Sequence, residues 1–169
     1  LIENKKLRAC YSYFTPIPYE NEFNILYLNA LKDIDAEATV NYCFDLIAQN
    51  SKVDYNVPYL KIAEEILERA NGNTSLLAKV KHDLFPFEPK FENYLFVVNH
   101  LENKAAITKF RNNTLARLRN LFYQNESNKI LYLQILNSED NTTKMLDVIK
   151  QTPMSYAVLK PYMDDLTTI

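Results

Sequence analysis

Glycine is nearly absent from this sequence. Gly72 is the one glycine in 169 residues, whereas glycine makes up roughly 7% of an average protein. Glycine lets a backbone reach positive φ or approach a ligand closely, as in phosphate-binding loops, dinucleotide-binding turns and nucleophile elbows. The sequence therefore excludes these three kinds of site. Helices joined by loops with proline, asparagine, aspartate or serine need little positive φ, so the shortage favours an all-α fold.

Long apolar runs and a strong net charge are also missing. No run approaches the roughly 18 to 20 apolar residues that span a bilayer, and Leu1 opens neither a signal peptide nor an initiator-methionine terminus. The formal charge of −2 gives no general attraction to nucleic acid or anionic lipid. We therefore expect one soluble domain over residues 1–169, without a membrane span, that is a fragment of a larger protein.

Cysteine is scarce too, with only Cys10 and Cys43. Each lies in an apolar helical neighbourhood, so we expect buried thiols rather than a disulfide. Four N-glycosylation sequons begin at Asn73, Asn112, Asn125 and Asn141, where roughly two are expected by chance in so asparagine-rich a chain. The compartment therefore stays open between an intracellular and a secreted protein.

What the sequence does contain is apolar residues at helical spacing. The clearest stripe lies in residues 22–34 and consists of Phe23, Leu26, Tyr27, Ala30, Leu31 and Ile34. Further helices are expected from an N-cap at Asp35, from Pro58 to residue 70, and over 76–85, 91–101, 104–124, 129–136, 142–151 and 154–166, with a break near Pro86 and Pro89 and a kink near Pro161.

Two details of these helices are open to test. Residues 129–136 also alternate as a strand would, but no second strand is present to pair with them, so we assign them as helix. On the helix after Pro58, the pairs Lys61–Glu65 and Glu65–Arg69 have the i,i+4 spacing of helical ion pairs.

A period near 35 residues emerges when the first helix of each expected pair is aligned. Four columns stay apolar: Ile25, Leu60, Leu95 and Ile130; Tyr27, Ile62, Val97 and Tyr132; Leu28, Ala63, Val98 and Leu133; and Leu31, Ile66, Leu101 and Leu136. The second helices keep phase less well. Both a short α-solenoid of antiparallel helical hairpins and an irregular helical bundle fit this pattern.

These four helical pairs, over about residues 22–151, resemble the hairpins of tetratricopeptide and pentatricopeptide repeat proteins. The chain departs from the tetratricopeptide signature, which contains Trp, Gly and Pro at fixed positions, and it lacks the closing Pro-Asp or Pro-Asn of pentatricopeptides. The resemblance implies that a peptide or an RNA strand binds along a concave face.

Residues capable of catalysis match no known motif. His82 and His100 have carboxylates nearby in sequence, but their spacing fits no metal site. Cys43 lies on the core face of its helix, which argues against a Cys-His nucleophile. We therefore predict a protein that is not an enzyme and that needs no cofactor or metal.

One charged segment stands out between Glu102 and Glu126, where no acidic residue occurs. Its cations are Lys104, Lys109, Arg111, Arg117 and Arg119. They could bind RNA or a phosphate ligand. Because the five side chains scatter around the helix axis, we favour apolar stems lying along the core and surface pairing.

An aromatic and proline cluster lies near the N-terminus, with Tyr11, Tyr13, Phe14 and Tyr19 as candidate binding residues. Aromatic side chains supply contact area at interfaces, but they also cap core edges, and capping is the interpretation we favour.

The sequence as a whole favours a helical scaffold that binds a protein or peptide partner. The alternatives are RNA or phosphate-ligand binding through residues 104–119, and an apolar ligand held between helices.

Overall fold

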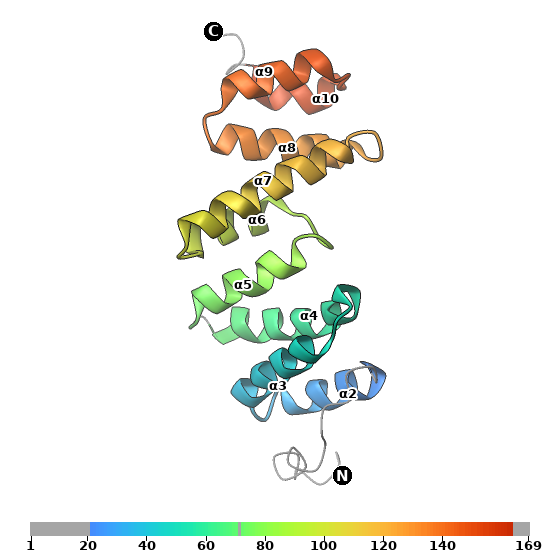
Figure 1. Cartoon of the computed structure of the whole chain (residues 1–169), viewed down its shortest axis with the longest axis vertical. Coiled ribbons are helices and arrows are strands. Elements are labelled where there is room, and N and C mark those ends of the chain that lie inside the picture. Colours follow the sequence, from blue (N-terminus) through green and yellow to red (C-terminus); the bar gives the residue numbers. More distant parts are fainter. Residues whose placement is uncertain (1–20, 71, 164–169) are drawn as a thin grey trace. The chain divides into compact units, whose positions relative to one another are not determined.

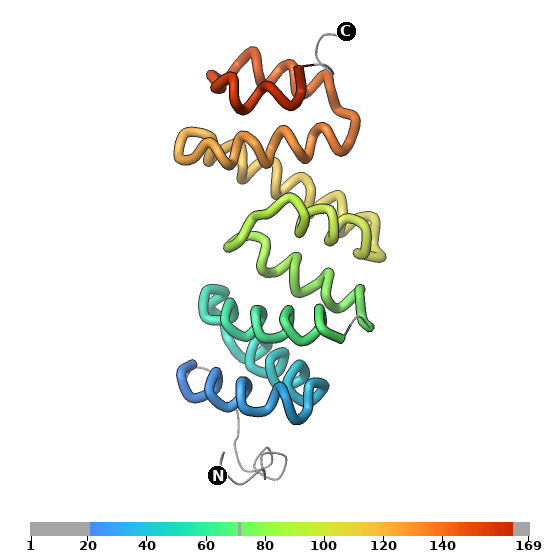
Figure 2. Tube along the Cα trace, turned by 180° about the vertical axis from the view of Figure 1, so that it is seen from behind, coloured from blue at the N-terminus to red at the C-terminus, as the bar shows by residue number. Residues whose placement is uncertain are grey.

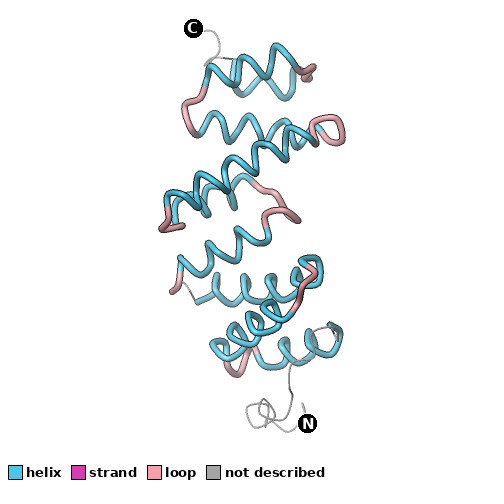
Figure 3. Tube along the Cα trace, viewed as in Figure 1, coloured by secondary structure: helices cyan, strands magenta, loops and turns pink. Residues whose placement is uncertain are grey.

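The computed structural model describes residues 21–70 and 72–163, and over these residues the chain contains helices and no strand. The helices, labelled in Figure 1 and coloured by type in Figure 3, are α2 (Asn21–Leu31), α3 (Ala36–Gln49), α4 (Val53–Ala70), α5 (Thr74–Leu84), α6 (Phe91–His100), α7 (Lys104–Asn120), α8 (Glu126–Ser138), α9 (Thr142–Gln151), α10 (Tyr156–Leu159) and the 3-10 helix η2 (Lys160–Tyr162). The all-α prediction is therefore confirmed.

Two compact units make up the chain, residues 1–89 and residues 90–169, called unit 1 and unit 2 below. The boundary follows Pro89, in the stretch where proline predicts a break. None of the described helices is long and apolar enough to cross a membrane.

In unit 1, α4 is the central helix and contacts α2, α3 and α5. Figures 1 and 2 show α3 on one side of α4 and α5 on the other. Its Tyr59 and Ala63 are fully buried, as are Leu28 of α2 and Leu46 of α3. A helix with neighbours on several sides must be apolar around most of its surface, which explains why α4 buries consecutive pairs of residues such as Ile62 with Ala63.

The predicted core face of α2 is partly wrong. Tyr27 and Leu31 are buried as expected, but Phe23, Leu26 and Ile34 are exposed, and Asn24 and Leu28 are buried in their place. Both faces of α2 are apolar in sequence, and its contacts with α3 and α4 decide which one is covered.

Asn24 can be buried because its amide Nδ2 donates to the Tyr59 hydroxyl at 3.2 Å. That hydroxyl in turn donates to Asn21 Oδ1 at 2.6 Å. A buried amide with a hydrogen-bond partner avoids most of the desolvation cost of an unpaired one.

The predicted start of α4 is also wrong, because the helix begins at Val53 and Pro58 lies inside it. A proline inside a helix removes the hydrogen bond to the carbonyl four residues earlier. Here that carbonyl belongs to Asp54, an exposed residue of the first turn, so water can replace the lost donor.

Helix N-caps explain the excess of sequons. Asn73, Asn125 and Asn141 cap α5, α8 and α9, and each side chain accepts a hydrogen bond from a backbone N–H of the first turn. Asparagine is among the best N-cap residues, and serine and threonine are common beside it at helix starts. Three of the four sequons therefore occur where helix capping alone would place these residues.

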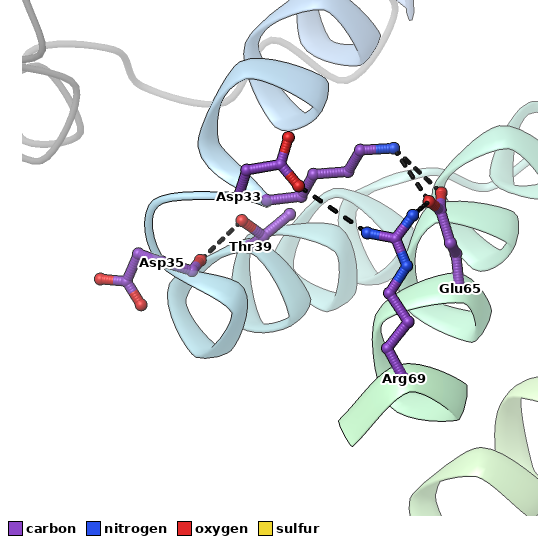
Figure 4. A network of polar contacts seen from close by, with 6 residues as sticks. Asp33, Asp35, Thr39, Glu65 and Arg69 are labelled. Carbon is purple, nitrogen blue, oxygen red and sulfur yellow. Dashed lines mark hydrogen bonds and ion pairs between the residues drawn. The ribbon is translucent and has the colours of Figure 1, made fainter. Parts of the chain in front are cut away.

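An ion-pair network joins the α2–α3 turn of unit 1 to α4 (Figure 4). Glu65 accepts from Lys32 Nζ at 3.0 Å and pairs with Arg69, which also lies 3.7 Å from Asp33. The predicted Glu65–Arg69 pair is thus confirmed. The predicted Lys61–Glu65 pair is wrong, because Lys61 pairs with Glu88 instead.

In unit 2, α8 is the central helix and contacts α6, α7, α9 and α10. Leu133, Ile135 and Leu136 are fully buried, and Tyr132 packs edge-to-face on Phe122 with ring centroids 5.0 Å apart. The helical assignment of this segment is confirmed. Its strand-like alternation arises because neighbours on several sides bury most of its circumference.

The 35-residue columns differ in burial. The column of Tyr27, Ile62, Val97 and Tyr132 is buried throughout, whereas the column of Ile25, Leu60, Leu95 and Ile130 runs from buried Leu60 to exposed Ile130. The repeat and its resemblance to known repeat families stay predictions.

Candidate interaction surfaces

The thiol of Cys43 lies in the packed core and forms no disulfide. Cys43 is fully buried, and burial raises the pKa of its thiol to about 12. Because the thiolate is the nucleophilic form, this cysteine is inert in the folded state.

The two histidines have separate local contacts. His82 Nδ1 lies 2.8 Å from Asp83 Oδ1 in unit 1. In unit 2, His100 Nδ1 lies 2.9 Å from the Phe96 carbonyl oxygen, and its ring stacks on the Phe96 ring. Within residues 21–70 and 72–163, no three His, Cys, Asp or Glu side chains gather as metal ligands would.

The basic segment predicted from the sequence forms α7, whose buried face consists of Phe110, Thr114, Leu115 and Leu118. Four of its cations, Lys104, Lys109, Arg117 and Arg119, are exposed. Arg119 Nη2 donates to Gln151 Oε1 of α9 at 3.3 Å. Most of the positive charge of α7 therefore faces solvent.

Arg111 differs from the other cations of α7, because it forms an ion pair with Glu139 at 2.6 Å. The other carboxylate oxygen of Glu139 accepts from the Tyr94 hydroxyl at 2.8 Å. Burial, with Glu139 adding to it, raises the pKa of Tyr94 well above its usual value. These contacts, together with the stacking of Tyr94 on Phe110, fix α7 against α6 and the end of α8.

The exposed surface of α7 contains no acidic side chain. It consists of Lys104, Ala105, Ala106, Thr108, Lys109, Asn112, Asn113, Ala116, Arg117, Arg119 and Asn120. Small and amide side chains thus lie among the cations, without a large apolar residue. We call this set the α7 surface.

A second candidate surface lies at the end of unit 2 that holds the α7–α8 turn and the α9–α10 loop. Lys129 Nζ of α8 donates to the Pro153 carbonyl oxygen of that loop at 2.9 Å, and Asn128 Nδ2 donates to the Leu121 carbonyl oxygen of the turn at 3.0 Å. Figure 1 shows both connections on the same side of unit 2.

Three exposed apolar side chains belong to this end: Tyr123 at 86% exposure, Tyr156 at 70% and Ile130 at 39%. We call them the aromatic surface. None of the three was predicted as a binding residue, because periodicity identifies residues that a helix can bury and does not show which of them remain uncovered. The position of Tyr123 just before the polar stretch from Gln124 to Asn128 was the one available signal.

The predicted N-terminal cluster of Tyr11, Tyr13, Phe14 and Tyr19 lies outside the described residues, as does Cys10. These residues stay predictions.

Comparison with known proteins adds no assignment: the chain has no significant match to a family model, to a characterised protein or to a solved structure.

Proposed function

We propose that this chain is a non-enzymatic helical module that binds a peptide segment of a protein partner. The observation that carries the proposal is the aromatic surface of Tyr123, Ile130 and Tyr156. Tyrosine is enriched among the residues that dominate binding energy, because it buries a large area at low entropic cost. While they are mostly exposed to solvent, the two tyrosines contribute no comparable burial energy to the folded unit.

Two hydrogen bonds connect the segments that carry this surface. The hydrogen bonds of Asn128 and Lys129 connect the first turn of α8 to the α7–α8 turn, which contains Tyr123, and to the loop that precedes Tyr156. A surface held in place before binding loses less conformational entropy when a partner docks. We expect the partner to contribute aliphatic side chains that pack on the two rings.

Peptide selection tests the proposal. Peptides selected on the full chain from a random display library should contain an apolar motif. The double variant Tyr123→Ser/Tyr156→Ser should then bind them about tenfold more weakly or worse, since hot-spot truncation costs about 1.4 kcal/mol or more. Binding is measured by fluorescence polarisation.

Leu26→Ser is the matched control, because Leu26 is exposed to a similar degree on α2 of unit 1. It should leave peptide binding unchanged. Equal binding by wild type and by the double variant, or no enriched peptide at all, would contradict the proposal.

A further inference from the structure

The exposed face of α2 in unit 1 complements the aromatic surface of unit 2 in residue type and in charge. We propose that these two surfaces bind each other between separate copies of the chain, so that α2 of one copy packs on Tyr123, Ile130 and Tyr156 of the next. This inference rests on the proposed binding function of the aromatic surface, and it names a second copy of the chain as a partner.

The centre of the exposed face of α2 is Leu26. Its side chain is 65% exposed, more than any other large aliphatic side chain of the described residues. Glu22 and Asn29 are exposed on the same side of the helix, four residues before Leu26 and three residues after it. We call these three residues the α2 face. The aromatic surface requires aliphatic side chains from its partner, and the α2 face presents one at its centre.

A comparison within the chain shows that the α2 face suits packing against other elements. Residues 25–28, Ile-Leu-Tyr-Leu, recur unchanged as residues 130–133 of α8. Leu131, the counterpart of Leu26, is only 6% exposed, because α8 has neighbours on several sides. The same local sequence is therefore covered in α8 and open in α2.

The place of α2 within unit 1 favours contact with another copy. The chain leaves unit 1 through residues 85–90, which follow α5. Figure 1 shows α2 and α5 at opposite ends of unit 1, with α4 between them. The α2 face thus lies at the end of unit 1 that is remote from its own connection to unit 2.

The charges around the α2 face are acidic. The one cation of residues 21–51, Lys32, is only partly exposed and is held by Glu65. The exposed charged residues of this stretch are Glu22, Asp33, Glu37 and Asp45. A partner for the α2 face should therefore carry cations at its rim.

Cations surround the aromatic surface. Arg119 of the α7 surface bonds Gln151, the last residue of α9. Lys160 follows Tyr156 by four residues, which is about one helical turn. The cations at this end of unit 2 are Arg119, Lys129, Lys150 and Lys160, and they outnumber Glu126, the exposed carboxylate of the first turn of α8.

This distribution of charge favours unlike surfaces over like ones. Two aromatic surfaces facing each other would bring their cations together, and two α2 faces would bring their carboxylates together, which is unfavourable in both cases. Pairing of unlike surfaces leaves one surface of each kind free on every complex, so association can continue beyond two copies. A peptide bound to the aromatic surface would displace the neighbouring copy.

Sedimentation equilibrium of the full chain over a range of concentrations tests the proposal. The weight-average mass should rise with concentration and pass that of a dimer. Raising the salt concentration from about 50 mM to about 500 mM should weaken association, because salt screens the charges at the rims of the two surfaces. A peptide selected on the aromatic surface should return the chain to a monomer.

Two variants, each lacking one surface, provide the decisive comparison. Leu26→Arg and Tyr123→Ser/Tyr156→Ser should each associate tenfold more weakly or worse when alone. Mixed in equal amounts, they should form a complex that stops at two copies, because one intact surface of each kind remains. The matched control Val53→Arg adds the same charge at a residue of α4 that is 61% exposed and should associate as wild type does. Unaltered helical circular dichroism shows that each variant folds.

Three results would overturn the inference: a wild-type chain that is monomeric at every concentration, undiminished association of Leu26→Arg, or no complex in the mixture of the two variants. Leu26→Arg should keep peptide binding, since its aromatic surface is intact. A monomeric chain that binds peptides through Tyr123 and Tyr156 would overturn this inference alone, whereas a chain that neither associates nor binds peptides would overturn the proposed function as well.

Discussion

The two units differ in how they compensate their charges. Residues 1–89 contain nine Lys or Arg and thirteen Asp or Glu, and residues 90–169 contain ten and eight. In unit 1 the cations Lys32, Lys61, Arg69 and Lys81 all pair with carboxylates of other elements. In unit 2 the cations of α7 other than Arg111 are exposed on a helix without carboxylates. These four cations thus connect elements of unit 1, whereas four of the five cations of α7 in unit 2 face solvent.

Core packing is the property the two units share, and altering it should produce the largest effects. Leu46 of α3 and Leu133 of α8 are fully buried. Changing either to alanine should lower the free energy of unfolding by about 2 to 5 kcal/mol, from lost burial and the cavity left behind. Hydrogen exchange should show lost protection mainly in the altered unit. Equal loss in both units would mean that they open together.

Removing the buried cation of unit 1 should have the next largest effect. Lys81 is buried and bonds Glu64 and Glu68, each at 2.7 Å. Burial alone would lower its pKa, but the two carboxylates outweigh burial and raise it. Lys81→Met leaves two carboxylates facing one another, so we expect a loss of about 2 kcal/mol at pH 7, measured by urea unfolding.

Two further variants refine this comparison. Glu64→Gln/Glu68→Gln added to Lys81→Met should restore most of the stability, because no unpaired charge remains. Arg111→Met in unit 2 should cost less than Lys81→Met, since Glu139 keeps the Tyr94 hydroxyl as a partner. If Lys81→Met is as stable as wild type, the contacts of Lys81 with Glu64 and Glu68 contribute nothing to the stability of unit 1.

The smallest expected effect is on the stability of the folded chain at acid pH. Hydrogen bonding from Lys32, with the charges of Lys32 and Arg69, lowers the pKa of Glu65 below its usual value. A lowered carboxyl pKa adds stability above the unfolded pKa of 4.5, and that stability is lost as pH falls through the folded pKa. Glu65→Gln should therefore flatten the acid side of the stability profile by less than about 1 kcal/mol, since the network is partly exposed.

Thermal melts from pH 6 to about pH 2 can measure this slope. If Glu65→Gln keeps the full acid dependence of the wild type, other carboxylates cause that dependence.

Local signals in the sequence predicted much of the fold. Asp35 caps α3 as expected, with its side chain accepting from the Ala38 N–H. The helix over 129–136 followed from the lack of a strand partner. The buried face of α2 could not be predicted, because Leu26 and Leu28 are equally apolar and the contacts of α2 with α3 and α4 decide which of them is covered.

The candidate surfaces likewise include one feature that the sequence predicts and others that it does not. The basic segment is visible in sequence because it lacks acidic residues. The pairing of Arg111 with Glu139 is a contact between distant residues, which no local rule predicts. The exposure of Tyr123 and Tyr156 likewise depends on how the helices pack around them, which the local sequence does not show.

The buried thiol of Cys43 makes unit 1 a reporter of its own opening. While the helices are packed, the raised pKa and the lack of access keep this sulfur from reacting. Each transient separation of α3 from its neighbours exposes it to a labelling reagent. In a Cys10→Ser background, the labelling rate at mildly alkaline pH therefore measures the free energy of that opening under native conditions, without denaturant and without an added probe.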